Sequence, residues 1–263
     1  MLNVLITGAA SGIGKAVKDK FLIEGHKVYA IDINDIEKQD NLISFKASIN
    51  DKQRLNEIYE NLQLDNVKFD VILDVAGIHK MASFVENDFE EIKRVIEINL
   101  LGTMLVNNTF YPLLKEKGRF VIVTSEVASL DPMPFNGLYN VSKTALDSYA
   151  QALRQELNLL DQKVITIRPG AIETPLSSGS MTDTEKLANE TKLYSKQAKK
   201  FSSIARKFMG KPMKAEKLAT LIYKASTKKN PRIIYQKHRN PGLVLLNILP
   251  KRLQCFVIKL LLK

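Results

Sequence analysis

The sequence predicts an α/β fold built on a doubly wound parallel sheet, both from its patterning and from its composition. Short apolar runs alternate with longer stretches whose apolar residues recur at helical spacing. Parallel strands need crossover connections, and such connections cover both faces of a sheet with helices. With 263 residues, 45% hydrophobic and 25% charged, the chain is long enough to bury one large core.

Six segments are expected to be strands, because each is a short apolar run of the kind that a parallel sheet buries. They are residues 4–7, 27–31, 42–46, 71–75, 119–124 and 164–168. Helical patterns separate them, and a long one runs from Tyr139 to about Leu159. No internal repeat occurs, and no linker is evident before about residue 176, so we expect a single domain over residues 1–263.

Two regions within this domain differ from the rest. Residues 177–209 are polar, lysine-rich and weakly patterned, and we expect residues 176–235 to form a substrate loop or lid. Residues 236–263 form a basic amphipathic tail, with seven formal or potential cations and no acid from residue 237 onward. Its two apolar runs are far shorter than the roughly 20 residues that span a bilayer. The tail therefore either lies at an anionic membrane surface or closes the substrate pocket or a subunit contact.

The net charge of +11 is concentrated in the last third of the chain. Residues 176–263 contain 20 basic and 4 acidic residues, whereas residues 1–175 contain 19 and 24. No recognition motif accompanies the basic segment, so we expect no nucleic-acid partner. A single cysteine and three scattered histidines predict neither a disulfide nor a metal site. The apolar start at residues 2–6 is typical of a strand rather than a signal peptide, and we expect a cytoplasmic protein, peripheral to a membrane if the tail binds lipid.

A glycine-rich turn follows the first expected strand and precedes a helical pattern. Its expected cofactor contacts are Gly8, Ser11, Gly12, Ile13 and Gly14. Glycines let a backbone approach a pyrophosphate closely, and a helix N-terminus offers free N–H groups and a positive dipole. A tight strand-to-helix turn with no ligand would have the same pattern, so the prediction of a nucleotide site depends on its context.

That context comes from the ends of later strands. Asp32 ends the second strand, eighteen residues beyond Gly14, where a carboxylate accepts hydrogen bonds from ribose hydroxyls and repels a 2′-phosphate. We therefore expect NAD(H) in preference to NADP(H), although a solvated strand-end aspartate would have the same pattern. The other expected cofactor contacts at strand ends are Ala76, Gly77, Pro169, Gly170, Ile172 and Thr174. Thr174 and the Ile172 backbone are candidates to hold the nicotinamide carboxamide.

Tyr139 and Lys143 lie one turn apart at the start of the long helical pattern, on one face. An ammonium beside a phenol stabilises the phenolate and lowers the tyrosine pKa from its usual value of about 10, which suits proton transfer during hydride transfer. The same spacing recurs at Tyr111 and Lys115, where Pro112 is unfavourable for a rigid helical pair. Position decides between the pairs, because only Tyr139 closely follows a strand with a polar end, residues 121–126.

Together these motifs resemble the single-domain branch of the short-chain dehydrogenase/reductase family over roughly residues 1–175. The resemblance is carried by the order and spacing of the glycine turn, Asp32, Ala76-Gly77, Asn99, the serine-bearing strand, Tyr139, Lys143 and Pro169-Gly170. It implies a Rossmann-type sheet of about seven strands, a homodimer or homotetramer built on helix faces, and NAD(P) as the cofactor. It also implies that Asn99 holds a water that relays protons through Lys143, whereas an asparagine in a helix is otherwise more often a surface or capping residue.

Departures from the family pattern concern the serine above all. In an ungapped comparison the family's catalytic serine stands thirteen residues before the tyrosine, which here is Glu126, with Ser125 one position earlier. Either Ser125 polarises the substrate oxygen or Glu126 occupies that place, and we favour Ser125 slightly. Asp74-Val75 stands where the family usually has two asparagines, and Ser48 where it often has an aspartate near adenine.

The sequence thus predicts an oxidoreductase that transfers a hydride between NAD(H) and a secondary alcohol or ketone, with Tyr139, Lys143, Asn99 and Ser125 as its catalytic residues. The chain's ending resembles that of hydroxysteroid and retinol dehydrogenases in the family, which implies a lipophilic substrate of steroid, retinoid or fatty type. The alternative is a non-catalytic nucleotide-sensing protein on the same fold, made conceivable by the irregular serine position. A cofactor-retaining epimerase or dehydratase fits the short chain less well.

Overall fold

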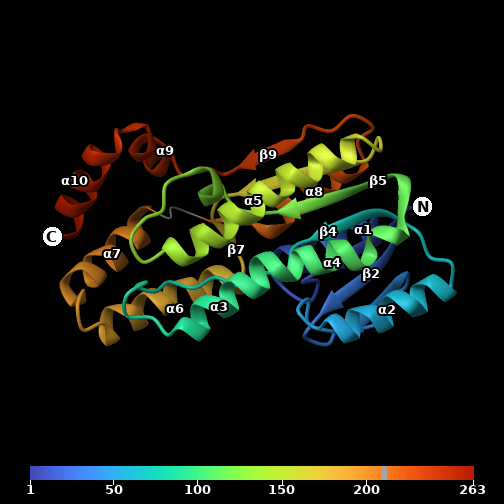
Figure 1. The fold of residues 1–263 in the computed structure, drawn as a ribbon, viewed down its shortest axis with the longest axis horizontal. Coiled ribbons are helices and arrows are strands. Elements are labelled where there is room, and N and C mark those ends of the chain that lie inside the picture. The colour runs from blue at the N-terminus through green and yellow to red at the C-terminus, as the bar shows by residue number, and fades with distance from the viewer. Residues whose placement is uncertain (209–211) are drawn as a thin grey trace.

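In the computed structural model, which describes residues 1–208 and 212–263, seven parallel strands form one central sheet (Figure 1). Its order is β3 (Leu42–Lys46), β2 (Lys27–Asp32), β1 (Asn3–Thr7), β4 (Phe69–Asp74), β5 (Leu114–Val123), β6 (Lys163–Pro169) and β9 (Ile234–Lys237). The chain winds outward from β1 in one direction and from β4 in the other. The predicted doubly wound sheet is confirmed, and its switch point between β1 and β4 is where ligands bind in such folds.

Helices cover both faces of the sheet, each over its own hydrophobic core. On one face α1 (Gly12–Ile23) and α8 (Ala215–Thr227) pack together, and Val17, Phe21 and Leu218 meet Val4 and Ile6 of β1. The other face carries α2 (Lys52–Leu64), α4 (Thr103–Phe110) and α5 (Gly137–Asn158). The apolar residues of these helices pack against the side chains that the same strands direct to this face. This alternation along each strand explains why the buried strands are apolar throughout.

All six strands expected from the sequence are present, with ends shifted by a few residues. The largest difference is at β5, which begins at Leu114 instead of residue 119. β9 was not among the six, because its sequence Ile-Tyr-Gln-Lys has no distinctive apolar pattern. It forms because its backbone pairs with β6 from Thr166 to Pro169.

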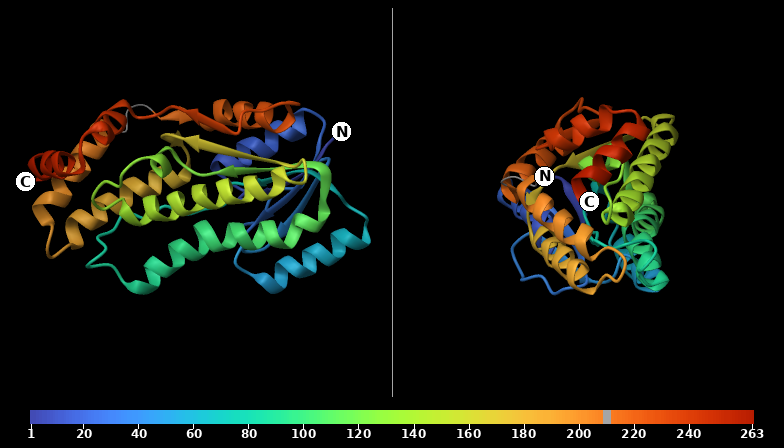
Figure 2. Two further views of the ribbon diagram at one scale, coloured as in Figure 1. Left: turned by 45° about the horizontal axis from the view of Figure 1, so that its top comes forward. Right: turned by 90° about the vertical axis from the view of Figure 1, so that its left-hand side faces the viewer.

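A group of helices extends the molecule beyond the carboxyl ends of the strands, at the end opposite the N-terminus (Figures 1 and 2). It consists of α6 (Pro175–Glu190), α7 (Ser195–Phe208), α9 (Pro241–Ile248) and α10 (Lys251–Leu262). Ala198 and Phe201 of α7, Phe135 and Leu262 form a small separate core there. A two-stranded sheet of β7 (Ile172–Glu173) and β8 (Met213–Lys214) joins this group to the main sheet. Of the expected lid region, α6 and α7 lie here, whereas α8 packs on α1.

The connection between β4 and α4 contains α3 (Phe89–Ile96), followed by a π-helical segment η1 (Glu97–Gly102). A short 3₁₀ turn η2 (Tyr111–Leu113) leads into β5, and another, η3 (Glu126–Ser129), leaves it. π-helical segments in helices are frequent at functional sites. No helix of the described chain has the length and apolar character needed to cross a bilayer.

Candidate active site

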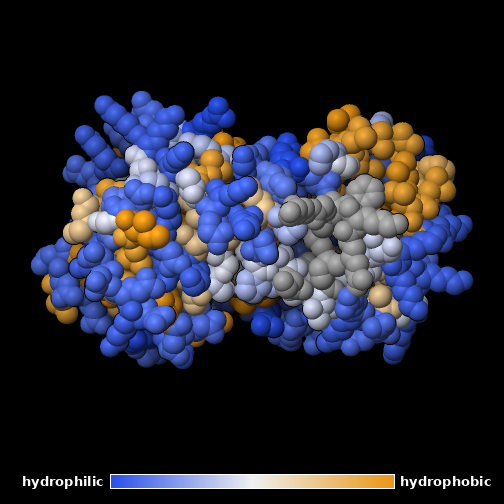
Figure 3. Space-filling model, turned by 180° about the vertical axis from the view of Figure 1, so that it is seen from behind, coloured by the Kyte–Doolittle hydropathy of each residue, from blue (hydrophilic) through white to orange (hydrophobic). Residues whose placement is uncertain are grey.

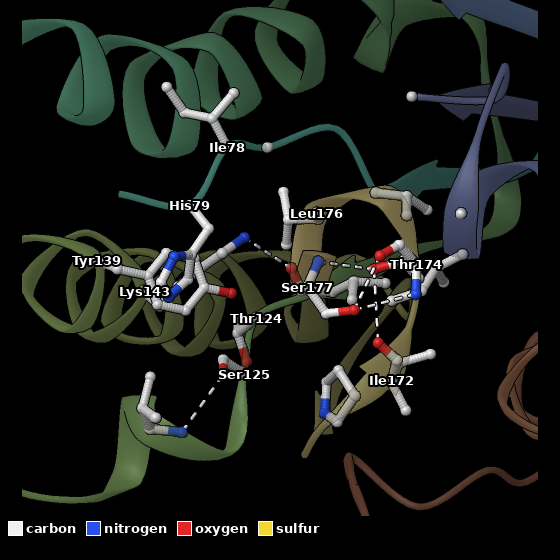
Figure 4. A pocket seen from close by; sticks show the side chains of 18 of the residues that line it. Ile78, His79, Thr124, Ser125, Tyr139, Lys143, Ile172, Thr174, Leu176 and Ser177 are labelled. Atoms are coloured by element: carbon white, nitrogen blue, oxygen red, sulfur yellow. Dashed lines mark hydrogen bonds between the residues drawn. The ribbon is translucent and has the colours of Figure 1, made fainter. Parts of the chain in front are cut away.

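A cleft of about 650 Å³ lies over the carboxyl ends of β1, β2, β4, β5 and β6 and reaches under α6, α7 and α9. Every site residue expected from the sequence contributes to its lining except Asn99. Figure 4 shows that Tyr139, Lys143, Ser125 and His79 gather at one end, and Ile172, Thr174 and Ser177 at the other. Segments far apart in sequence therefore meet at one crevice.

The glycine-rich turn is packed so tightly at Gly8 and Gly14 that neither position has room for a side chain. Gly8 has φ +69°, and a Cβ there would lie 2.8 Å from the Ala76 Cα. A Cβ on Gly14 would lie 1.9 Å from the Gly8 carbonyl oxygen, and Gly12 has φ +52°. Helix α1 begins directly after Ser11 and has no acidic residue in its first turn. Its N–H groups and positive dipole therefore face the cleft with no carboxylate of the first turn to neutralise them, which suits a pyrophosphate.

Asp32 is buried at the end of β2, beside this turn. Its two carboxylate oxygens accept hydrogen bonds from the backbone N–H groups of Ala10 and Asn34, each at 2.9 Å. These bonds hold the carboxylate at the edge of the cleft, where it is 9% exposed. A negative charge fixed there favours ribose hydroxyls and disfavours a phosphate.

Thr174 caps α6 and lies across the glycine turn. Its hydroxyl accepts a hydrogen bond from the Ser177 N–H (3.2 Å), and the Ser177 hydroxyl accepts one from the Thr174 N–H (3.1 Å). Thr174 Cβ would be 3.2 Å from a Cβ on Gly12, so the two sides of the cleft nearly touch. Ile172 is buried in β7 and lines the same wall.

Pro169 and Gly170 lie at the end of β6. The structure shows why glycine is needed at position 170, which the sequence did not reveal. A Cβ on Gly170 would be 1.8 Å from the His238 carbonyl oxygen. The Gly170 N–H also donates a hydrogen bond to the Lys237 carbonyl (2.9 Å). Gly170 is therefore required where the chain between β9 and α9 crosses the cleft wall.

Tyr139 and Lys143 lie on the first turns of α5 and both are buried. The Lys143 ammonium lies 5.9 Å from the centre of the Tyr139 ring and donates a hydrogen bond to the Val123 carbonyl (3.3 Å). Burial raises the pKa of Tyr139 to about 12, and the nearby Ser125 hydroxyl opposes that rise. Burial lowers the pKa of Lys143 to about 8, opposed by the charge of Asp74. Tyr139 is thus a neutral phenol at neutral pH, since burial outweighs the lowering expected from the ammonium.

Asn99 is fully buried in the π-helical segment η1 and fixes the loop after β4. Its amide accepts a hydrogen bond from the Ile78 N–H and donates one to the Ile78 carbonyl, both 2.8 Å long, and also donates to the Ser142 hydroxyl (3.0 Å). A Cβ on Gly77 would approach the Asn99 amide oxygen to 3.1 Å and the Lys143 nitrogen to 3.3 Å. The Asn99 amide and the Lys143 ammonium therefore lie close together, both beside Gly77.

Ser125 and Glu126 have different surroundings. Ser125 has extended backbone, with φ −168°, and its side chain lies beside Tyr139 (Figure 4). Glu126 points to the C-terminal segment, where its carboxylate accepts a hydrogen bond from the Asn240 N–H (2.7 Å). Burial raises the pKa of Glu126, and this hydrogen bond opposes the rise. Ser125 is thus the neighbour of the tyrosine, and Glu126 holds the start of α9.

His79 is a site residue that the sequence did not indicate. Its ring centre is 4.3 Å from that of Tyr139, at an interplanar angle of 45° (Figure 4). Burial lowers its pKa to about 4, so the ring is neutral. A lone histidine two residues after Gly77 has no recognisable spacing, and only the tertiary structure places it against the tyrosine.

The second tyrosine–lysine pair lies elsewhere. Tyr111 belongs to η2, at the amino end of β5, and Lys115 belongs to β5 itself. The Lys115 ammonium forms a 2.8 Å ion pair with Asp70. The two residues therefore do not share a helix and do not line the cleft.

Comparison with known proteins agrees with this geometry. A family model described as short chain dehydrogenase matches residues 2–185. The chain belongs to this family. It is an oxidoreductase of the short-chain dehydrogenase type with an NAD(P)-binding Rossmann fold.

Individual members of the family are moderately similar to it. The NADPH-dependent 1-acyldihydroxyacetone phosphate reductase of Schizosaccharomyces pombe is 32% identical over 68% of this chain and 64% of its own length, slightly under two thirds. The 3-oxoacyl-[acyl-carrier-protein] reductase FabG of Thermotoga maritima is 30% identical over 66% of this chain and 75% of its own. Among solved structures, a short chain dehydrogenase family protein from Francisella tularensis has a TM-score of 0.73 at 26% identity, covering 90% of this chain and 97% of that one.

Proposed function

We propose that this protein reduces a ketone on a lipophilic molecule to a secondary alcohol, reversibly, with NADH in preference to NADPH. The observation that most supports this is the grouping of Tyr139, Lys143 and Ser125 in a cleft that the glycine-rich turn also lines. A tyrosine with a pKa of about 12 is protonated at neutral pH and can give a proton to a carbonyl oxygen.

The proposed roles follow from these positions. The Ser125 hydroxyl donates a hydrogen bond to the substrate carbonyl oxygen, and Tyr139 Oη donates its proton to the same oxygen. The Lys143 ammonium then stabilises the phenolate that remains. Tyr139 is reprotonated through Lys143 and a water held near Asn99. His79, neutral and packed on the tyrosine ring, excludes water and fixes the ring's orientation.

The nucleotide site fits NAD(H) on three observations. The glycine turn is so compact that a Cβ on Gly8 or Gly14 would clash with neighbouring backbone, the first turn of α1 presents N–H groups and no carboxylate, and Asp32 holds a negative charge at the edge of the cleft. Ala76, Pro169, Ile172 and Thr174 complete the walls. When bound, NAD(H) supplies or accepts the hydride.

The substrate end of the cleft is lined largely by apolar side chains from separate elements: Met81, Met133, Phe201, Ile204 and Leu243. Such a lining favours an acyl chain or another apolar body over a sugar. The names of two relatives, an acyldihydroxyacetone phosphate reductase and an oxoacyl reductase, both include an acyl group and a reduction. We therefore place fatty ketones before steroids and retinoids among the candidates.

Replacing the phenol tests the proposal directly. Tyr139→Phe is expected to lower kcat for ketone reduction by about 10²–10⁴-fold, the contribution of a positioned general acid. NADH affinity, measured by fluorescence titration, should stay close to that of the wild type. Tyr111→Phe is the matched control, with unchanged kcat. Wild-type turnover by Tyr139→Phe contradicts the proposal, and a wild type that binds NADH but reduces none of a panel of fatty, steroid and retinoid ketones favours the nucleotide-sensing alternative.

We further propose that α9 and α10 lie on an anionic membrane surface, with the protein otherwise cytoplasmic. Their exposed apolar side chains are Leu245, Ile248, Leu253, Phe256, Leu260 and Leu261. They form the orange patch at the upper right of Figure 3. The opposite side of α10, with Ile258 and Leu262, packs on the small core around α7. Arg252, Lys259 and Lys263 supply positive charge on α10 and at its C-terminal end, whereas Lys251 is paired with Asp131.

Vesicle sedimentation tests this contact. The wild type is expected to bind vesicles of phosphatidylcholine with phosphatidylserine, and binding should fall as salt rises. The double variant Phe256→Ser/Leu260→Ser should lose binding, whereas Ile23→Ser/Leu64→Ser, which removes two exposed apolar side chains elsewhere, should keep it. Equal binding by both variants contradicts the proposal. If the patch instead mediates a homo-oligomer, the variant Phe256→Ser/Leu260→Ser should have a lower mass than the wild type in analytical ultracentrifugation.

A further inference from the structure

Two residues in the wall of the cleft have a buried polar atom with no hydrogen-bond partner among the described residues. The atoms are Nδ1 of His79 and the amide oxygen of Asn136. A few other buried side-chain atoms of the described chain also lack a partner, among them the amide nitrogen of Asn87, but their residues do not line the cleft. Buried polar groups are nearly always paired, so two unpaired ones in a ligand cleft point to a polar group on the ligand.

Asn136 stands at the N-cap of α5, where an asparagine ordinarily has another use. An N-cap side chain usually accepts a hydrogen bond from an N–H group of the first turn. Here the Asn136 side chain makes no such bond. Only its backbone joins the helix, by accepting a hydrogen bond from the Asn140 N–H (3.0 Å). The helix therefore does not use the Asn136 amide oxygen, which is available to another donor.

The segments that carry the two residues are joined next to Tyr139. The Ala82 N–H, in the segment after β4, donates a hydrogen bond to the carbonyl of Phe135, the residue before Asn136 (2.8 Å). The ring centre of His79 is 4.3 Å from that of Tyr139 (Figure 4). Asn136 precedes Tyr139 by three positions, the spacing of neighbours on one helix face. Both polar groups therefore lie beside the tyrosine that meets the ketone oxygen in the proposed reaction.

The chemistry of this pair fits a hydroxyl group. Burial lowers the pKa of His79 to about 4, and the charge of Asp183 and the side chain of Asn136 only partly oppose this. The imidazole is therefore neutral at pH 7, with one N–H donor and one acceptor nitrogen. The Asn136 oxygen only accepts. A hydroxyl group donates one hydrogen bond and accepts another, whereas a keto or ether oxygen has no proton to donate to the amide.

We infer that His79 and Asn136 form a second polar subsite, which binds a hydroxyl group that the substrate carries close to its ketone. The inference rests on the proposed function, because that function places the ketone oxygen at Tyr139. It narrows the substrate class from lipophilic ketones in general to hydroxy ketones. A ketone without the hydroxyl leaves both polar atoms unpaired, and a site built to pair such a group discriminates against a ligand that lacks it.

The experiment compares a long-chain methyl ketone with the hydroxymethyl and hydroxyethyl ketones of the same acyl length. In the wild type with NADH, kcat/KM is expected to be at least about tenfold higher for one of the two hydroxy ketones. In Asn136→Ala this preference should disappear, while kcat/KM for the methyl ketone stays close to that of the wild type. His79→Phe keeps a ring against Tyr139 without its nitrogens and should also reduce the preference.

Asn87→Ala is the matched control. It also removes a buried amide with an unpaired atom, but one outside the cleft, and the preference should be retained. Tm of Asn136→Ala should stay near that of the wild type, because the side chain does not cap α5. Equal kcat/KM for all three ketones in the wild type overturns the inference. A loss of Tm in Asn136→Ala with equal loss of activity toward all three ketones also overturns it, because it would show a structural role.

Binding without turnover separates this inference from the proposed reduction. Dissociation constants of the three ketones are measured by calorimetry on Tyr139→Phe loaded with NAD⁺, and again on Tyr139→Phe/Asn136→Ala. About tenfold tighter binding of a hydroxy ketone, lost in the double variant, supports the inference even if the wild type reduces none of the three, in which case the proposed reduction alone fails. Binding of both hydroxy ketones no tighter than that of the methyl ketone overturns the inference.

Discussion

Replacing Gly170 with alanine should push the chain between β9 and α9 away from the end of β6, at the wall of the cleft. The added Cβ would lie 1.8 Å from the His238 carbonyl oxygen, and real Cβ atoms stay beyond 3.0 Å, so the backbone must move by about 1.2 Å. The His238 carbonyl belongs to the backbone, which cannot rotate away as a side chain can. The chain from β9 into α9 therefore has to separate from the end of β6.

The cost follows from the contacts that this separation disturbs. Overpacking of a close-packed site costs about 1–3 kcal/mol. The Gly170 N–H to Lys237 bond (2.9 Å) and the Asn240 N–H to Glu126 bond (2.7 Å) weaken with it, at about 1 kcal/mol each when fully lost. We expect the free energy of unfolding to fall by about 2–4 kcal/mol, which lowers Tm by roughly 5–15 °C in a chain of this size.

Thermal unfolding followed by circular dichroism measures this change. Gly179→Ala is the matched control, because a Cβ there meets nothing within 4 Å, and alanine in a helix is neutral or mildly stabilising. KM for the ketone should also rise in Gly170→Ala, since Asn240 and Leu243 line the cleft. Equal Tm values for the two variants would refute the reasoning, because they would mean that the C-terminal segment does not press on Gly170.

Three other changes have definite expected outcomes. Asp32→Ser removes the charge that disfavours a 2′-phosphate, so the ratio of NADPH to NADH dissociation constants should fall at least about tenfold, or 1.4 kcal/mol; an unchanged ratio in fluorescence titrations contradicts the assigned preference. Lys115→Ala breaks the pair with Asp70 at the far end of β5 and should leave kcat/KM unaltered, whereas a large loss would implicate the second tyrosine–lysine pair. His79 has a pKa of about 4 in the fold against about 6.5 unfolded, so the unfolded chain binds more protons between these values and stability is lost as pH falls through that window. The loss is about 2 kcal/mol from pH 7 to 5, and urea unfolding of His79→Gln should show a flatter dependence; parallel curves would mean that His79 is not the group responsible.

The fold and the cofactor half of the site could be predicted from the sequence because their signals are local. The turn from Gly8 to Gly14 and the carboxylate at Asp32 lie within one β–α–β unit, where residue spacing fixes geometry. Tyr139 and Lys143 are neighbours on a single helix for the same reason. The six strands with continuous apolar runs were recognisable because a strand that is buried on both faces is apolar at nearly every position.

The remaining features depend on contacts between segments distant in sequence, for which no local pattern exists. β9 is a strand because its backbone pairs with β6, and Glu126 turns from the tyrosine because its carboxylate accepts a hydrogen bond from the Asn240 N–H, 114 residues away. The same distance in sequence hides the packing of His79 on Tyr139. Burial then reverses one expectation: the sequence predicted a tyrosine pKa lowered by an ammonium, and desolvation in the folded cleft raises it. Side-chain chemistry and short spacings were readable from the sequence, whereas desolvation and long-range pairing arise only when the chain is folded.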